Sequence, residues 1–218
     1  MTLPFDHRVQ AGQLLGQALH KYAQRPDVLV LALPRGGVPV GFEIAKAIGA
    51  PLDVMMVRKL GAPGREELAM GAIASGGIRI LNRDVVTSLG IPEKIIQNVA
   101  VKEQQELERR SHAYRGGRGF PEVKEQCLIV VDDGLATGAT MRAAVAALRA
   151  KAPARIVVAV PVAPPSSVEQ IRQEADEVVC LETPEPFFGV GRWYRDFPQT
   201  TDQEVKDLLA RSREKSRR

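Results

Sequence analysis

The stretch LIVVDDGLATGATM, residues 128–141, joins an apolar run to two adjacent acids and then to a turn of small residues. The apolar run has the length of a buried strand, and a helical pattern begins again at Met141. Asp132 and Asp133 stand side by side at the end of the strand, where their like charges repel each other. We therefore expect this junction between strand and helix to be a ligand site.

Outward from this stretch, short apolar runs alternate with helical patterns. We predict buried strands at 28–34, 52–57, 127–131, 155–163 and 177–182, and helices at 7–22, 40–48, 141–150 and 166–174. Asp6 is expected to cap the first helix. Alternating strands and helices are typical of an α/β fold, here an open, mainly parallel sheet with helices on both faces.

Residues 60–125 interrupt this alternation and form a hairpin and helix excursion from the sheet. We predict a loop at 59–67, a hairpin at 68–81 and a very polar helix at 92–113. The excursion is either a lid or a structural insertion. The whole chain, 1–218, is expected to be a single domain, with its core at 25–60 and 125–183 and a C-terminal hood and helix at 184–218.

Composition narrows the class of protein. Hydrophobic residues make up 44% of the 218 residues and charged residues 26%, as in ordinary globular proteins. No apolar stretch reaches the roughly 18–20 residues that a membrane span needs, and the first residues lack the pattern of a secretion signal. Cys127 and Cys180 lie in apolar runs, so we expect two buried thiols and a cytoplasmic protein without a membrane partner.

The charged groups suit a small anionic ligand at least as well as nucleic acid. The net charge is +4, and the three histidines are too scattered for a metal site. The basic end, residues 210–218, is interpreted as a solvated helix end, although a nucleic-acid contact there stays open. Because no aromatic residue interleaves with those charges, we do not expect a nucleic-acid partner.

The turn after the two acids has the features of a phosphate site. It offers successive backbone N–H groups, small side chains and the start of a helix, all of which favour a bound anion. Thr137 and Thr140 add hydroxyl donors. The acids need hydroxyl groups or a cation, so a sugar phosphate would satisfy both halves of the motif. The Gly-Lys-Ser/Thr and GxGxxG patterns of nucleotide-binding loops are missing, and a purely structural strand end stays open.

The string IVVDDGLATGAT resembles the phosphoribosyl pyrophosphate (PRPP) motif of the type I phosphoribosyltransferases, especially the adenine enzymes. The strings LPRGGVPV, VRKLGAPG and VGRWYRDF extend the resemblance to a bacterial branch of that family, and the order of elements agrees over 28–183. The resemblance implies that Asp132 and Asp133 bind the ribose hydroxyls. It also implies a 5′-phosphate site at Ala136, Thr137, Gly138, Ala139 and Thr140.

PRPP also carries a pyrophosphate, for which the resemblance implies a second anion site. Arg35, Gly36 and Gly37 follow the first buried strand, and the two glycines permit backbone shapes that other residues avoid. Arg58 and Lys59 are expected to end the second strand on the same rim, where their charges would bind pyrophosphate. A plain turn and a solvated rim are the alternatives.

The resemblance also suggests how a reaction would proceed. Mg²⁺ would arrive bound to PRPP, so no direct protein ligand is expected. Lys59 would stabilise the leaving group, and Glu67 is the candidate that handles the proton of the base, although Glu66 and Glu67 could equally be solvated carboxylates. The phosphoribosyltransferases for 6-oxopurines carry an Asp at the position of Ala136, so this departure argues against those bases.

An aromatic cluster at 186–197 is expected to form the hood over the base. Phe188, Trp193 and Tyr194 would offer a stacking face to a flat heterocycle. The alternative is a hydrophobic cluster that anchors the C-terminal helix.

The sequence thus predicts a Mg²⁺-dependent phosphoribosyltransferase that acts on a nucleobase or similar nitrogen heterocycle in nucleotide salvage. A PRPP-sensing regulator without turnover, which could bind nucleic acid, is the competing hypothesis. Whether the protein forms a homodimer stays open.

Overall fold

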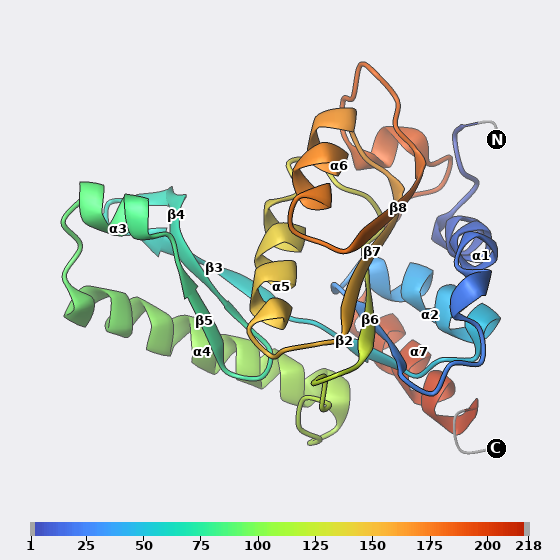
Figure 1. The fold of residues 1–218 in the computed structure, drawn as a ribbon, viewed down its shortest axis with the longest axis horizontal. Helices are drawn as coiled ribbons and strands as arrows, with labels where there is room; N and C mark the ends of the chain where they lie inside the picture. Colours follow the sequence, from blue (N-terminus) through green and yellow to red (C-terminus); the bar gives the residue numbers. More distant parts are fainter. Residues whose placement is uncertain (1–2, 216–218) are drawn as a thin grey trace.

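The computed structural model describes residues 3–215, apart from the side chains of Glu66, Glu67 and Lys215. Its centre is a five-stranded parallel sheet in the order β2-β1-β6-β7-β8 (Figure 1). The strands are β1 (Val28–Ala32), β2 (Leu52–Val54), β6 (Cys127–Val131), β7 (Arg155–Val162) and β8 (Glu177–Glu182). Every residue of β1 and β6 is buried, which explains why these strands read as continuous apolar runs.

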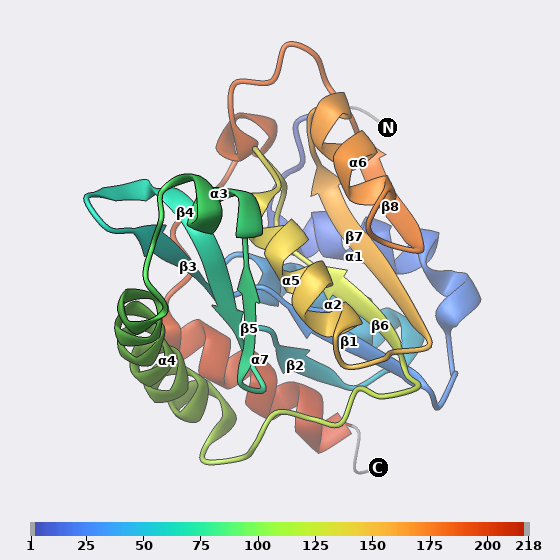
Figure 2. The ribbon, with the colours of Figure 1, turned by 60° about the vertical axis from the view of Figure 1, so that its left-hand side comes forward.

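Helices cover both faces of this sheet, as Figures 1 and 2 show. They are α1 (Arg8–Ala18), α2 (Gly37–Ile48) and α7 (Asp202–Lys215) on one face, and α5 (Ala139–Arg149) and α6 (Pro165–Arg172) on the other. Alternate side chains of the central strands divide between the two faces: Ile129 packs with the first group, Leu128 with the second. The predicted fold class is therefore confirmed.

The excursion is a second, antiparallel sheet with a long helix beside it. It consists of β3 (Val57–Ala62), β4 (Arg65–Ala74), β5 (Ile78–Leu81), α3 (Arg83–Ser88) and α4 (Glu93–Arg115). The hairpin predicted at 68–81 is confirmed as β4 and β5. Figure 1 shows the excursion extending to one side of the parallel sheet.

The loop predicted at 59–67 is wrong, because most of it is strand. β3 and β4 pair across a turn at Pro63 and Gly64, and Gly64 has a φ of +71°. The single strand predicted at 52–57 is also wrong, since β2 ends at Val54 and β3 begins at Val57. Glycine and charged residues have weak strand propensity, but cross-strand pairing and the burial of Leu60 and Ala62 outweigh it.

Two helix ends differ from the prediction. α1 is capped by His7, whose side chain accepts from the N–H of Gln10 at 3.1 Å, and Asp6 instead exchanges two hydrogen bonds with the Gln10 side chain. α4 continues to Arg115 and ends at Gly116, whose φ is +63°. Tyr114 and Arg115, which follow the predicted end of this helix at 113, therefore lie in its last turn.

The hood segment at 186–197 pairs with the N-terminal segment of the chain. A short 3₁₀ helix, Val190–Trp193, lies in the hood. Phe5 donates from its N–H to the carbonyl of Trp193 at 2.8 Å and accepts from the N–H of Arg195 at 2.8 Å. The aromatic cluster thus fastens the N-terminal segment, whereas α7 packs on α2, α4 and β2.

Cys127 is buried in β6, as predicted, and Cys180 in β8 is half-buried. Within residues 3–215, no helix combines the length and the apolar character that crossing a membrane requires.

Candidate functional site

The two acids directly follow β6, and each uses one carboxyl oxygen within the protein. Asp132 accepts from the N–H of Asp133 through Oδ1 at 2.8 Å. Asp133 accepts from Nε of Arg8 through Oδ2, also at 2.8 Å, and its side chain is 15% exposed. Apart from the contact between the two carboxyl groups, the described residues supply no donor to Asp132 Oδ2 or Asp133 Oδ1. One oxygen of each acid is therefore left for a ligand.

Burial dominates the electrostatics of the pair. It raises the pKa of Asp132 well above the ordinary value, and the charge of Asp133 raises it further. Burial also raises the pKa of Asp133, although the guanidinium of Arg8 opposes this shift. A ligand that donates hydroxyl groups to both carboxylates would favour their ionised forms, which burial disfavours.

The loop after β1 lies directly against the acids. A Cβ atom on Gly36 would lie 1.9 Å from Oδ2 of Asp133, and one on Gly37 would lie 2.7 Å from the carbonyl oxygen of Val131. Gly36 has a φ of −59°, which other residues also adopt, so the close approach of the acid is what requires a glycine there. The Pro34–Arg35 peptide bond in this loop is cis.

Arg35 lies at the edge of the same loop. Its Nη1 atom is 3.7 Å from Oδ1 of Asp202, the first residue of α7, and more than a third of its side chain is exposed. Asp202 also accepts from the hydroxyl of Tyr114 at 2.5 Å. The structure thus brings Arg35 to the rim beside the acids, and its role toward pyrophosphate stays a prediction.

The turn between the acids and α5 presents unused backbone donors. In the described part of the chain, no acceptor lies on the N–H groups of Ala136, Thr137 and Gly138. The carbonyl of Ala136 accepts from Ser167 at 2.6 Å, which fixes the turn. Ala139 begins α5, so these donors meet a helix N-terminus, where an anion is favoured.

Arg58 and Lys59 do not end the second strand, because both lie inside β3 of the antiparallel sheet. Arg58 forms an ion pair with Glu103 of α4. The structure therefore directs Arg58 toward α4 instead of the acid pair. The expected location is wrong, while the proposed contact of both residues with pyrophosphate stays a prediction.

Glu67 lies in β4, and its side chain is outside the described residues. Its role as the group that handles the proton of the base therefore stays a prediction.

The three hood residues lie in different environments. Tyr194 is buried, and its hydroxyl donates to the carbonyl oxygen of Asp133 at 2.6 Å, so it supports the acid loop. Burial raises the pKa of Tyr194 far above the ordinary value. Trp193 packs on Phe187 with ring centroids 6.2 Å apart. Phe188 is 73% exposed, which leaves it the most open of the three for stacking.

Sequence reasoning missed Arg8, which the structure places at the acid pair. Its guanidinium contacts Asp133, donates from Nη1 to the carbonyl oxygen of Pro198 at 2.6 Å and lies 3.8 Å from the ring centroid of Phe197. A hint was available, since two adjacent buried acids need a nearby cation. No local pattern pointed to a residue 125 positions away.

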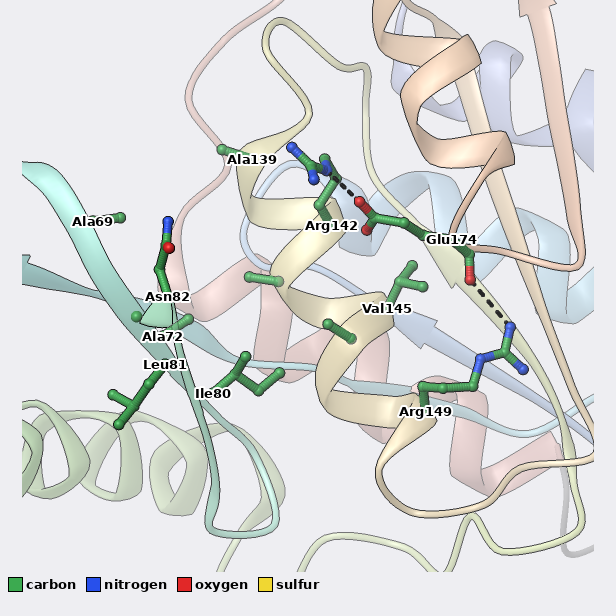
Figure 3. Close-up of a pocket in the computed structure, with 13 residues that line it drawn as sticks. Ala69, Ala72, Ile80, Leu81, Asn82, Ala139, Arg142, Val145, Arg149 and Glu174 are labelled. Carbon is green, nitrogen blue, oxygen red and sulfur yellow. Dashed lines mark hydrogen bonds and ion pairs between the residues drawn. The ribbon is translucent and has the colours of Figure 1, made fainter. Parts of the chain in front are cut away.

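A cleft of about 510 Å³ lies between α5 and the strands β4 and β5 (Figure 3). Its walls carry mostly small side chains, and the ion pair of Arg142 with Glu174, at 2.6 Å, lies on one side. Ala139 lies at one end of the cleft, so the cleft adjoins the phosphate turn.

Comparisons with known proteins place this geometry in a family. The family model described as a phosphoribosyl transferase domain matches residues 8–194. Two Mycobacterium tuberculosis proteins, each named as a candidate phosphoribosyl transferase, are 47% identical over 208 residues, which are 95% of this chain and 47% of theirs. The chain thus spans about half the length of those relatives.

Two further relatives cover different shares of the chain. The crystal structure of TT1426 from Thermus thermophilus is 40% identical, with a TM-score of 0.86, over 96% of this chain and 99% of that one. The bifunctional protein PyrR of Ralstonia nicotianae is 35% identical over 148 residues, which are 63% of this chain and 84% of that protein.

The matched residues begin at Arg8 and end at Tyr194, so they contain both acids, the phosphate turn and the loop after β1. The chain belongs to the phosphoribosyl transferase domain family.

Proposed function

We propose that this protein transfers the 5-phosphoribosyl group of PRPP to a nucleobase or similar nitrogen heterocycle and releases pyrophosphate. One observation carries the proposal. Two partly buried acids, each with one carboxyl oxygen that accepts from no N–H or hydroxyl of the described residues, adjoin a turn at a helix N-terminus whose N–H groups likewise have no acceptor among those residues. A sugar diol with a phosphate on the same sugar is complementary to that arrangement.

Each part of PRPP has a place beside these residues. The ribose hydroxyls would donate to Asp132 Oδ2 and Asp133 Oδ1. The 5′-phosphate would accept from the N–H groups of residues 136–138 and from the hydroxyls of Thr137 and Thr140 in the first turn of α5. The pyrophosphate would meet Arg35 and the backbone of the loop after β1. Two carboxylates beside the sugar would favour the positive charge that builds on it as pyrophosphate departs.

Mg²⁺ would be held mainly by the phosphates of PRPP and by water. The described residues contain no group of three or more His, Cys, Asp or Glu side chains that could hold a metal. The free carboxyl oxygens of Asp132 and Asp133 are hard ligands of the kind that Mg²⁺ accepts, so they are compatible with a cation carried in on the substrate. Such a cation would neutralise charge on the departing pyrophosphate.

The acceptor would lie under the hood, with Phe188 and Trp193 nearest to it. Ala136 in place of an acid argues against 6-oxopurines as acceptors. Glu67 would handle the proton of the base and Lys59 the charge of the leaving group. Nucleotide salvage in the cytoplasm is the role that fits such a reaction.

The proposal is tested by incubating the full chain with PRPP, Mg²⁺ and a panel of purine and pyrimidine bases while pyrophosphate is measured. We expect release with at least one base. The Asp132→Asn, Asp133→Asn double variant is the control, and we expect it to lose turnover. Equal release by this variant would contradict the site assignment.

A second candidate is a regulator that binds PRPP without turnover. The 35% identity with the bifunctional protein PyrR of Ralstonia nicotianae favours keeping it in view. Micromolar PRPP binding without pyrophosphate release for any base would support the regulator. A nucleic-acid binding assay with and without PRPP would then test whether PRPP changes the affinity of the protein for nucleic acid.

A further inference from the structure

Arg8 connects three parts of the molecule through one side chain. From the first turn of α1 it contacts the Asp133 carboxylate through Nε, the Pro198 carbonyl through Nη1 and the Phe197 ring through its face. The side chain is only 11% exposed. A long cationic side chain loses rotamer freedom in such a position, so these contacts must offset an entropic cost.

The acid pair receives its compensating charge from Arg8. Asp132 faces Asp133 on the same turn, Tyr194 of the hood contributes a neutral hydroxyl to the Asp133 carbonyl, and Gly36 adds no charge. Among residues 3–215, the ion pairs join Arg8 alone to either acid. Glu204 of α7 also interacts with the charge of Arg8, and its carboxylate accepts from the N–H of Thr201; His7 and Asp196 line the same small cavity as Arg8 and Glu204.

The contact with Arg8 also sets which oxygen of Asp133 remains for a ligand. Nε binds Oδ2, the same atom that lies against Gly36. Both sides of that oxygen are therefore occupied by protein, and Oδ1 remains. Since Nη1 of Arg8 donates to the carbonyl oxygen of Pro198, the orientation of the acid is linked to the hood segment at 197–198.

We propose that Arg8 is a positioning residue for the sugar: its cation holds the Asp133 carboxylate oriented toward the ribose hydroxyls, and it links that acid to the hood. This inference rests on the proposed function, because it assigns the ribose to the acid pair. In the competing role, the ion pair of Arg8 with Asp133 blocks the site. Arg8 would then have to move away from Asp133 before the sugar could bind. The two roles predict opposite changes in affinity when the cation is removed.

The test compares two variants. Arg8→Gln keeps N–H donors and removes the charge, whereas Arg8→Lys keeps the charge and loses the planar guanidinium group. Affinity for PRPP with Mg²⁺ is measured by calorimetry between pH 6 and pH 9. At pH 7 we expect Arg8→Gln to bind about tenfold more weakly or worse, since a charge-assisted contact is lost. Without Arg8 the pKa of Asp133 rises, so this loss should shrink as the pH increases. Arg8→Lys should keep the wild-type pH profile with a smaller loss.

Arg195→Gln is the matched control. Arg195 pairs with Asp6 at 2.7 Å in the same region, and its side chain is exposed. It should leave both the affinity for PRPP and its pH profile unchanged. Thermal unfolding of each variant separates a change at the site from a loss of fold, and Arg8→Lys keeps the test decisive if Arg8→Gln does not fold.

The possible results distinguish this inference from the function on which it rests. Unchanged or tighter PRPP binding by Arg8→Gln across the whole pH range, with normal binding by the wild type, would overturn the positioning role alone. Failure of the wild type to bind PRPP would overturn the proposed function. In that case a rise in the pKa of the Asp133 carboxyl in Arg8→Gln, measured by carbon NMR without ligand, still supports the coupling of Arg8 to Asp133, and an unchanged pKa overturns it.

Discussion

Burial of Asp132 beside Asp133 costs the folded protein free energy that a hydroxyl-bearing ligand could recover. A carboxyl group whose folded pKa lies above its unfolded pKa stabilises the fold below the unfolded pKa. That contribution is lost as the pH rises through the folded pKa. Burial and the neighbouring charge put Asp132 in this class. At neutral pH the charged pair therefore lowers the stability of the fold.

We predict that Asp132→Asn stabilises the protein at pH 7 and weakens PRPP binding. The amide keeps an oxygen acceptor for the N–H of Asp133 and removes the charge repulsion. The free energy of unfolding should rise by about 1–2 kcal/mol at pH 7 and by nothing measurable near pH 4. Urea unfolding at both pH values measures this.

Asp176→Asn is the opposite control. The Asp176 carboxylate accepts from the N–H of Ile156 at 2.7 Å and pairs with Arg149, and its pKa is lowered. Its contribution to stability is present above the unfolded pKa and is lost as the pH falls through the folded pKa. This variant should therefore be less stable than the wild type at pH 7. A loss of stability in Asp132→Asn as well would contradict our account of the acid pair.

The second residue-scale prediction concerns Gly36. In Gly36→Ala the new methyl group would overlap Oδ2 of Asp133, so the carboxylate must move away from its contact with Arg8. We expect PRPP affinity to fall by about tenfold or more, the equivalent of one charge-assisted hydrogen bond. Isothermal calorimetry checks it. In Gly119→Ala nothing lies within 4 Å of the new atom, so wild-type affinity is expected. Equal affinity in the two variants would refute the close approach as a functional constraint.

At the scale of secondary structure, the register of β1 and β6 explains why two separate loops form one site. Ala32 and Val131, the last residues of these strands, are partners in the parallel ladder. The loops that follow therefore start side by side, although about a hundred residues separate them. Because ligands bind beyond the carboxyl ends of parallel strands, this register positions Gly36 against Asp133.

The hood supports this edge through Tyr194, which gives a prediction at the same scale. Tyr194→Phe keeps the ring stacked on Phe197 at 4.8 Å but removes the donor to the Asp133 carbonyl. We expect a loss of about 1 kcal/mol in stability and weaker PRPP binding, because a buried carbonyl loses its partner.

Tyr22→Phe provides the comparison. Its hydroxyl donates to Glu177 at 2.7 Å, at the amino end of β8 and so at the opposite edge of the sheet. A similar loss of stability with unchanged PRPP affinity is expected there. Denaturant unfolding measures the stability of both variants, and calorimetry measures their affinity for PRPP. Equal effects of the two substitutions on PRPP affinity would argue against a special role for the hood.

At the scale of the whole molecule, one buried cation fastens the excursion to the parallel sheet. Arg115, in the last turn of α4, is 2% exposed. It donates to Asp53 of β2 at 2.8 Å, to the carbonyl oxygen of Val54 and to Ser111. The end of α4 is thus held where the chain leaves the sheet, which keeps the excursion in a defined position.

We predict that Arg115→Met destabilises the protein strongly, by about 3–5 kcal/mol, because Asp53 loses its partner and a buried carbonyl is left unpaired. Arg109→Met on the same helix removes an exposed ion pair with Glu106 and should cause no measurable change. Guanidinium unfolding followed by circular dichroism compares them. A small effect in Arg115→Met would show that packing alone holds the excursion.

Much of the fold could be predicted because the parallel strands are buried on both faces. The strands at 127–131 and 177–182 are found with the predicted bounds, since continuous apolar runs mark them clearly. β3 and the start of β4 could not be predicted, because Gly61, Gly64 and the neighbouring charges have weak strand propensity. Their pairing depends on a partner strand and on burial against α4. No pattern of neighbouring residues in the sequence indicates these contacts.

The order of the parallel strands and their helices, the two loops at the strand ends and the adjacent acids with the turn after them follow from the sequence alone. These are local properties, read from hydrophobic period and from neighbouring residue types. Three contacts depend on the folded chain: Arg8 binds Asp133, Gly36 lies against Asp133, and the Tyr194 hydroxyl donates to the carbonyl oxygen of Asp133. Such contacts join residues that lie far apart in the chain. Charge alone would allow many partners for each of them. The packing of the whole fold selects one partner, and hydrophobic periodicity does not encode that packing.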